Sequence, residues 1–275
     1  MQIYYQGYPG AYGNKASLQV AKRLDIQTDH IVGVETFKEV FDKIQQGNIG
    51  VLPIENSYAG SIHENFYHMI AGKYTIIGEI FLDINHCLLG KTNNISKIKK
   101  AYSHPQALMQ CQNYLKKYNI EPVVASDTAG AAKFISEQND ETLASISSDL
   151  CSELYHLEMI DKNIQDQTGN TTRFFVVVQK EIFEKQKEYF YLPKTGKISI
   201  QFKTKDTPSA LYKCLGAFAT RYINLTKIES LPARENRFEY IFWIDFEKNV
   251  EEKVIFDAFE ELQFFCKDFI VLGDY

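Results

Sequence analysis

The sequence has little of what builds metal sites and disulfide frameworks. Its 275 residues include five cysteines, an odd number, and no two of them stand in CxxC spacing. This pattern is typical of reduced thiols in a cytoplasmic protein, so we predict neither a disulfide framework nor a zinc site. No two of the six histidines are four residues apart, so no helix is expected to present a histidine pair to a metal. We therefore predict no metal site.

Long apolar runs and positive charge are also scarce. The sequence contains no run of about 18 apolar residues, so no segment is expected to span a membrane. The start, "MQIYYQGYPG", lacks the basic residues and apolar run of a signal peptide, and we expect a cytoplasmic location. The net charge of −5 argues against a protein that binds nucleic acid by neutralising phosphates.

Arginine is rare as well, with five among the 30 basic residues. One of the five, Arg173, lies in the stretch "DQTGNTTRFFVVV", where a polar turn runs straight into an apolar strand. Arginine can hold a carboxylate through two parallel hydrogen bonds, which lysine cannot do. This stretch is therefore a candidate for part of a binding site.

The strands and helices that the sequence predicts alternate in the order of an α/β fold. In the first part we expect strands at 2–7, 30–35 and 49–56 and helices at 15–24, 36–47 and 61–72. The segment 74–90 forms two apolar strands or one long bent strand. The pattern then repeats, with strands at 98–104, 121–126, 143–148 and 172–180 and helices at 105–118, 128–138 and 149–157.

Local signals mark the ends of two of these helices. Thr36 and Glu39 have the spacing of a capping box, and Gly47 ends the helix that they begin. Ser61 and Glu64 repeat the same spacing, so Ser61 is expected to cap the third helix.

The pattern divides the chain into a two-lobed region and a separate C-terminal domain. We expect residues 1–180 to form two lobes, one from about 1–80 with 160–180 and the other from about 81–159. Residues 181–196 are charged and aromatic without a clean period, and we interpret them as a linker. Residues 197–275 have the order strand, helix, strand, strand, helix, strand, which is the ferredoxin-like split βαβ unit.

Polar side chains follow the buried strand 49–56 at its carboxyl end. Glu55, Asn56 and Ser57 come in succession, and Gly60 follows. In α/β folds this end of a strand is where ligands bind, so we favour a site over a simple turn.

Two other helix starts allow both a structural and a functional interpretation. Ser103 and Gln106 have capping-box spacing, and a cap is the favoured interpretation there. Ser126, Asp127 or Thr128 caps the helix at 128–138, whose small residues would let a ligand approach its first turn.

The glycines of "GYPGAYG" match neither the dinucleotide-binding pattern nor the phosphate-binding loop, so we predict no cofactor. That segment is either a tight turn or a turn whose N–H groups face an anion. The candidate side chains offer hydroxyls, amides, one Glu and one Arg, and they include no histidine–nucleophile pair. This set suits the binding of a small polyanion. The protein could bind such a molecule, or it could be an enzyme that needs only to deliver a proton.

Several motifs together make the chain resemble the prephenate dehydratase family and its relative, arogenate dehydratase. They are "QGYPGAY", "LPIENSYAGSIHEN", "HCLLG", "SHPQALMQC", "SDTAGAAKFI", "GNTTRFFVV", "PSALYKCLGAF" and "NLTKIESLPAR". The resemblance implies a two-lobed catalytic domain of the type II periplasmic-binding-protein class, followed by a ferredoxin-like βαββαβ ACT domain that regulates it. It also implies a homodimer or homotetramer through ACT domains and, since no chorismate mutase segment precedes the first motif, a monofunctional form.

The implied reaction converts prephenate to phenylpyruvate, CO2 and water, with L-phenylalanine as effector. One alternative is arogenate dehydratase, and a rival of another class is a non-catalytic amino-acid or keto-acid sensor. By resemblance Thr172 is a hydrogen-bond donor or proton relay toward the leaving hydroxyl, and Glu55 is either a proton source or structural. Arg173 either grips a substrate carboxylate or braces the loop. The substrate-binding residues implied by the motifs are Asn56, Ser57, Gly60, Ser103, Gln106, Ser126, Thr128, Asn170, Thr171, Arg173 and Phe174.

Three positions depart from the family pattern. Gly13 stands where a serine is frequent, Ser209 where a glycine is expected, and Leu231 where an arginine is expected. The last two lie in segments that line the phenylalanine site of relatives, so they leave the strength and sign of feedback open. The expected effector residues are Ser209, Ala210, Leu211, Asn224, Leu225, Glu229 and Ser230.

Overall fold

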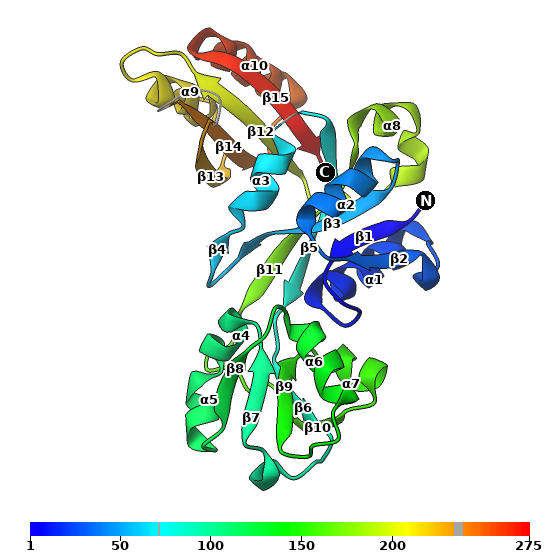
Figure 1. The fold of residues 1–275 in the computed structure, drawn as a ribbon. Helices are drawn as coiled ribbons and strands as arrows, with labels where there is room; N and C mark the ends of the chain where they lie inside the picture. Colours follow the sequence, from blue (N-terminus) through cyan, green and yellow to red (C-terminus); the bar gives the residue numbers. More distant parts are fainter. Residues whose placement is uncertain (71, 234–238) are drawn as a thin grey trace. The chain divides into compact units, whose positions relative to one another are not determined.

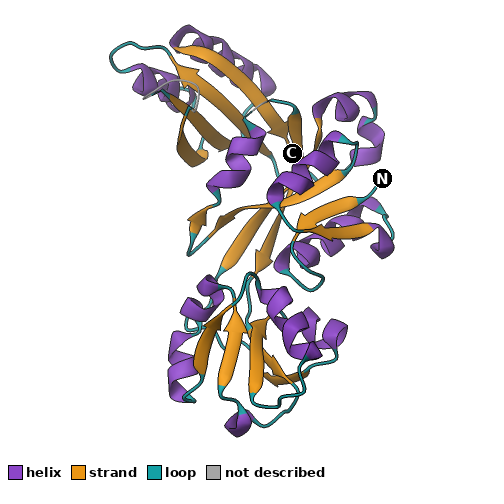
Figure 2. Ribbon diagram, in the orientation of Figure 1, coloured by secondary structure: helices purple, strands orange, loops and turns teal. Residues whose placement is uncertain are grey.

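The computed structural model of the chain describes residues 1–70, 72–233 and 239–275 (Figures 1 and 2). These residues form two compact units, which are described separately below. The first comprises Met1–Ile62 and Ile80–Phe175, and the second comprises His63–Glu79 and Val176–Tyr275. The contacts thus group His63–Glu79 with the C-terminal residues, whereas the sequence pattern suggested a division at about residue 180.

The first sheet has the strand order β2-β1-β3-β11-β5, with the short strand β4 paired to β3. β1 is parallel to both β2 and β3, as expected for strands joined through helices. The elements of this region are β1 (Ile3–Gln6), α1 (Tyr12–Leu24), η1 (Thr28–His30), β2 (Ile31–Val34), α2 (Phe37–Gln45), β3 (Ile49–Asn56), β4 (Gly60–Ser61), β5 (Tyr74–Asp83) and β11 (Thr171–Gln179).

The predicted ends of α2 are confirmed, and the predicted cap of the next helix is wrong. The Thr36 hydroxyl oxygen accepts a hydrogen bond from the Glu39 N–H, and Gly47 follows the helix with a φ of +90°. Ser61 instead lies in β4, where it pairs with Glu55 of β3, and helix α3 begins at His63.

The second sheet has the order β10-β6-β9-β7-β8 and lies in the first unit. Its elements are β6 (Cys87–Gly90), η2 (Ile95–Lys97), β7 (Lys100–Ser103), α4 (Pro105–Gln110), α5 (Gln112–Lys117), β8 (Glu121–Val124), α6 (Thr128–Glu137), β9 (Leu143–Ser147), α7 (Leu150–Tyr155) and β10 (Glu158–Asp161). The expected single helix at 105–118 is interrupted at Cys111, and the sequence did not predict β10.

Helices cover both faces of this second sheet. Along β6 the side chains alternate, so Leu88 packs with residues of α4 and α5, whereas Cys87 and Leu89 pack with residues of α6 and α7. Figure 1 shows these two helix pairs on opposite sides of the strands. Burial on both faces explains why the inner strand β6, CLLG, is apolar and buried along its whole length.

The second unit contains the predicted βαββαβ order, which confirms the expected ferredoxin-like fold. Its sheet has the order β13-β14-β12-β15, with antiparallel neighbours. The elements are α3 (His63–Met69), α8 (Lys180–Lys185), η3 (Lys187–Phe190), β12 (Lys197–Thr204), α9 (Ala210–Ala219), β13 (Leu225–Pro232), β14 (Tyr240–Glu247), α10 (Glu252–Phe265) and β15 (Cys266–Asp274). The segment interpreted as a linker therefore contains helix α8.

Strand β14 shows how this sheet is buried on both faces. Ile244 and Phe246 join the core formed with α9 and α10. Trp243 faces the other way and meets Phe66 of α3 edge to face, with 4.8 Å between ring centroids. Beside it, the buried Asp245 carboxylate accepts hydrogen bonds from the Trp243 indole at 2.7 Å and the Ser199 hydroxyl at 2.6 Å. A buried carboxylate is tolerable here because donors surround it.

No helix in the described ranges combines the length and the apolar character needed to cross a bilayer.

Gly33 in β2 provides a test of the packing around the first sheet. An added Cβ would lie 2.3 Å from the Gly7 carbonyl oxygen and 3.0 Å from the Tyr5 hydroxyl. We expect Gly33→Ala to lower the free energy of unfolding by about 1–3 kcal/mol in urea denaturation, because backbone must move.

Gly216 in α9 is the matched control, because an added Cβ there has no neighbour within 4 Å. Gly216→Ala should raise the free energy of unfolding by about 0.5–1 kcal/mol through helix propensity. Equal effects of the two substitutions would contradict the packing described for β2.

Candidate active site

The first unit contains a cavity of about 270 Å³ between its two lobes. One wall comes from the β1–α1 turn, the end of β3 and the start of β11, and the other comes from the second lobe. The lining residues are Gln6, Gly7, Ala11, Tyr12, Gly13, Pro53, Asn56, Ala59, Ile62, Ile84, His86, His104, Gln106, Ala107, Gln110, Asp127, Thr128, Asn170, Thr172 and Phe174. Carboxyl ends of strands thus meet a ligand-sized cavity, as the sequence led us to expect.

The alternation of side chains along β11 decides which of its residues reach the cavity. Thr172 and Phe174 line it, and Arg173 and Phe175 do not. Arg173 is only 6% exposed, and its guanidinium lies 4.7 Å from the centroid of the Phe175 ring and 6.0 Å from that of Phe81. This placement favours a structural role for Arg173, which braces the loop, over binding of a substrate carboxylate.

The Asn56 side chain connects β3 to the start of β11. Its Oδ1 accepts hydrogen bonds from the N–H groups of Tyr58, at 3.0 Å, and Ala59, at 2.9 Å. These bonds orient the amide, so Nδ2 donates to Thr172 Oγ1 at 2.9 Å and to Asn170 Oδ1 at 2.6 Å. Within the described ranges no group accepts the Thr172 hydroxyl proton, so this proton can be donated into the cavity.

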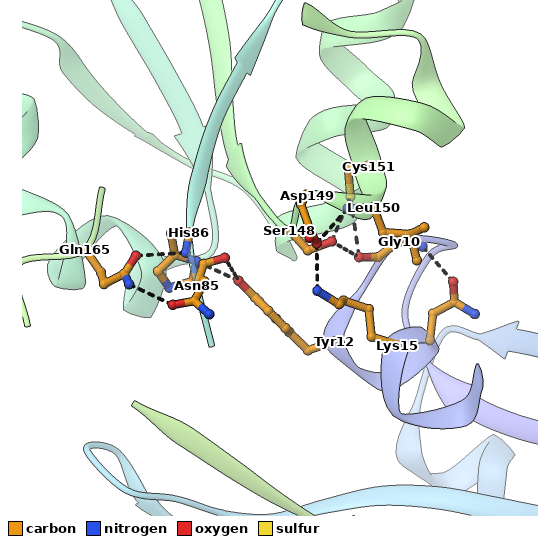
Figure 3. A network of polar contacts seen from close by, with 11 residues as sticks. Gly10, Tyr12, Lys15, Asn85, His86, Ser148, Asp149, Leu150, Cys151 and Gln165 are labelled. Carbon is orange, nitrogen blue, oxygen red and sulfur yellow. Dashed lines mark hydrogen bonds and ion pairs between the residues drawn. The ribbon is translucent and has the colours of Figure 1, made fainter. Parts of the chain in front are cut away.

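The hydrogen bonds continue from Asn170 across to the second lobe. Asn170 Nδ2 donates to Gln110 Oε1 at 3.1 Å, and His86 Nε2 lies 2.9 Å from the same oxygen. The Tyr12 hydroxyl lies 3.1 Å from His86 Nδ1 and 2.8 Å from the Asn85 carbonyl oxygen (Figure 3). A continuous set of polar contacts therefore joins Thr172 to Tyr12 along one side of the cavity.

The protonation of His86 follows from these contacts. Because Gln110 Oε1 can only accept, the adjacent His86 Nε2 must carry a proton. The ring is 2% exposed, and burial lowers its pKa, although the Gln110 contact opposes the shift. A neutral ring then has a bare Nδ1, which shares the single proton of the Tyr12 hydroxyl with the Asn85 carbonyl oxygen. Burial raises the pKa of this hydroxyl.

The two lobes also meet beside the first turn of α1. The Gly10 carbonyl oxygen accepts from the Ser148 hydroxyl at 2.6 Å, and Lys15 forms an ion pair with Asp149 at 2.6 Å (Figure 3). Burial opposes the effect, but the hydrogen bond and charge of Lys15 lower the pKa of Asp149. Burial raises the pKa of the neighbouring Cys151 to about 12, so this thiol is a poor nucleophile.

Of the expected substrate-site residues, the structure brings one group to the cavity wall: Asn56, Gln106, Thr128, Asn170, Thr172 and Phe174. The others do not line it: Glu55, Ser57, Gly60, Ser103, Ser126, Thr171 and Arg173. Ser57 and Thr171 support the site, since Ser57 Oγ accepts from the Thr171 N–H at 3.0 Å.

The structure identifies the capping residue at the two helix starts for which the sequence allowed both a cap and a ligand contact. Ser103 is fully buried, and its hydroxyl donates to the Ile146 carbonyl oxygen at 2.5 Å. The cap of α4 is His104, whose Nδ1 accepts from the Gln106 N–H at 3.2 Å, so the predicted Ser103 cap is wrong. The cap of α6 is Asp127, which accepts from the Gly130 N–H at 2.7 Å.

Sequence reasoning missed the roles of Tyr12, His86 and Gln110. All three lie in the motifs "QGYPGAY", "HCLLG" and "SHPQALMQC", but nothing in those motifs shows that they contact one another. Their signal was the presence of polar residues in otherwise apolar segments.

The fold and the cavity define the class of protein: a two-lobed α/β domain of the type II periplasmic-binding-protein class with a C-terminal ACT-like domain. The family model "Prephenate dehydratase" matches residues 3–182. The chain belongs to the prephenate dehydratase family.

Relatives with known names agree with this assignment. Prephenate dehydratase of Methanocaldococcus jannaschii is 41% identical over 247 residues, which cover 88% of this chain and 87% of the relative. Arogenate dehydratase/prephenate dehydratase 2 of Arabidopsis thaliana is 36% identical over 287 residues, which cover 100% and 72%.

Solved structures are similar over nearly the whole chain. Prephenate dehydratase of Arthrobacter aurescens in complex with L-Phe has a TM-score of 0.85 and 25% identity, covering 99% of this chain and 89% of that one. A protein described as a novel type of quorum quenching acylase has a TM-score of 0.85 and 28% identity, covering 99% and 97%.

The buried, neutral His86 predicts a specific dependence of stability on pH. Because its pKa in the folded protein lies below its ordinary value of 6.5, the unfolded chain takes up a proton first as the pH falls. The contribution of neutral His86 is therefore complete above a pH of about 6.5 and is lost as the pH falls toward the lowered pKa.

Urea denaturation at pH 7.5, 6.5 and 5.5 should show a smaller loss of stability at low pH in His86→Gln than in the unmodified protein. The other histidines are the same in both proteins, so the difference between the two curves isolates His86. Parallel curves would mean that His86 is not held neutral by burial.

Proposed function

We propose that the protein is a prephenate dehydratase that uses the Thr172 hydroxyl as a donor to the leaving group. The observation that carries this proposal is the Asn56–Thr172 contact at the wall of the cavity. Asn56 occupies the Thr172 oxygen as an acceptor, which leaves the hydroxyl proton for a substrate oxygen.

The proposed reaction consumes one proton. The C–C bond to the ring carboxylate breaks as CO2 leaves, and its electron pair enters the ring. The ring C–O bond breaks, and the departing hydroxide takes the proton to become water. Because the ring becomes aromatic, the enzyme needs mainly to orient the substrate and stabilise the leaving oxygen.

Thr172 suits the second of these tasks. Its hydroxyl is too weak an acid to give up its proton outright near neutral pH, so it acts as a hydrogen-bond donor or relay. Gln110 suits the first task, since its amide nitrogen has no acceptor within the described ranges and can donate to a substrate carboxylate. Glu55 does not line the cavity, so we assign it no direct contact with the leaving hydroxyl.

Acyl transfer is a second candidate, because one structural neighbour is described as an acylase. The cavity gives it less support. Among its described lining residues there is no serine or cysteine to serve as a nucleophile, and neither Thr128 nor Thr172 has a base hydrogen-bonded to its hydroxyl in the described ranges. The nearby Cys151 is buried with a raised pKa.

We further propose L-phenylalanine as an effector of the C-terminal domain, a homodimer or homotetramer formed through that domain, and a cytoplasmic location. A related structure contains L-Phe, which supports the effector. Ser209, Ala210 and Leu211 line a cavity of about 590 Å³ at the start of α9. Asn224, Leu225, Glu229 and Ser230 do not line it.

Thr172→Val tests the catalytic assignment because it removes the hydroxyl and keeps the shape. We expect kcat for prephenate to fall by about 100-fold or more, the usual effect of losing one donor to the transition state. Steady-state kinetics on purified protein measure the change.

Thr172→Ser is the matched control, because serine keeps the hydroxyl, and its kcat should stay within about tenfold of the unmodified protein. If Thr172→Val retains kcat within about twofold, a barrier change below about 0.5 kcal/mol, the assigned role of Thr172 is wrong.

Ser209 tests the effector site, because it adopts a left-handed conformation with a φ of +62°. Side chains with a Cβ are strained there, so Ser209→Gly should raise the free energy of unfolding by about 1 kcal/mol in urea denaturation. It should also tighten L-phenylalanine binding in equilibrium dialysis, since it removes bulk from the cavity wall. An absence of saturable L-phenylalanine uptake by both proteins would reject the effector assignment.

A further inference from the structure

The charges around the active-site cavity are unusual for a site that takes a dianion. Among the described residues that line it, Asp127 is the one carboxylate, and none is lysine or arginine. His86 is neutral because burial lowers its pKa, and His104 accepts a hydrogen bond at Nδ1. The nearby Arg173 lies on the opposite face of β11, against aromatic rings. The cavity therefore presents a negative side chain without a positive one on its wall.

The position of Asp127 leaves part of its carboxylate available. One oxygen, Oδ1, accepts from the Gly130 N–H at 2.7 Å and caps α6. The other oxygen, Oδ2, lies where a Cβ on residue 130 would come within 2.6 Å, so the glycine makes room for it. Within the described ranges no N–H or O–H group donates to Oδ2. A cap needs one oxygen, and the second can meet a ligand.

Prephenate and arogenate differ in the group that Asp127 Oδ2 would contact. Prephenate carries two carboxylates and a keto group, with a charge of about −2 near neutral pH. In arogenate an ammonium replaces the keto oxygen, so the charge is about −1. A carboxylate on the cavity wall attracts the ammonium and repels additional negative charge, and this difference is a source of specificity.

We propose that Asp127 is a specificity-determining residue whose carboxylate pairs with the ammonium of arogenate, so that the site takes arogenate as a substrate beside prephenate. This inference rests on the proposed dehydratase function and on Thr172 as the donor to the leaving hydroxyl, which both substrates share. Asp127 takes no part in breaking the C–O or C–C bond.

Asp127→Asn is the decisive substitution, because asparagine caps helices as well as aspartate does and removes only the charge. Purified protein is assayed with arogenate and with prephenate, and the ratio of the two kcat/KM values is compared between variants. We expect the unmodified protein to turn over both substrates, and the arogenate-to-prephenate ratio to fall by about tenfold or more in Asp127→Asn, as expected for the loss of a partly buried charge pair. Asp127→Ser, which also keeps a capping oxygen, should show the same change.

Asp149→Asn is the control for the loss of one negative charge in the same unit. Asp149 pairs with Lys15 and does not line the cavity, so the ratio should stay within about twofold of the unmodified protein. If Asp127→Asn abolishes turnover, the same ratio is taken from dissociation constants measured by calorimetry, with Thr172→Val present in both proteins to slow the reaction.

The outcomes separate this inference from the proposed function. If the unmodified protein turns over neither substrate, the dehydratase assignment fails. If it turns over either one and the ratio is unchanged in Asp127→Asn, the dehydratase assignment stands and the role of Asp127 is rejected. A ratio that rises in Asp127→Asn would also reject it.

Discussion

The fixed orientation of the Asn56 amide is the constraint on which the active-site cavity depends. Two N–H groups of its own loop hold Oδ1, so the nitrogen must face β11 and donate there. That nitrogen sets the Thr172 hydroxyl and the Asn170 side chain together. Asn170 in turn binds Gln110 of the other lobe. Since every group in this set depends on the direction of its neighbour, the arrangement acts as one unit and not as separate contacts.

Much of the fold could be predicted from the sequence because apolar runs and helix ends are local signals. The strand expected at 49–56 begins and ends where the structure has β3, and the order of elements expected for 197–275 is the order from β12 to β15. The Ser61 cap failed because Ser-x-x-Glu marks a helix start only when the serine is not already paired in a sheet, and β4 is too short to show alternation. The break at Cys111 was hidden because the sequence continues a helical pattern through it.

The position of a site residue could be predicted only where the signal was local, as for a side chain whose direction is set by its strand. Thr172 was singled out through the resemblance of its motif to the family, and its side chain lines the cavity. The contacts among Tyr12, His86 and Gln110 join residues that are 24 and 74 positions apart, and sequence spacing does not reveal them. Asp127 was seen as one of three capping candidates, and its second oxygen becomes visible only when the walls of the cavity are known.

The strand β11 also limits how this protein can change over evolution. Thr172 and Arg173 face opposite sides of the sheet, and successive residues of a strand alternate. Inserting or deleting one residue between Asn170 and the apolar run would turn each side chain to the other face of the sheet. Side chains that now line the cavity would then lie against the aromatic rings, and the reverse. We therefore expect the spacing within 170–179 to be constant among descendants of this protein.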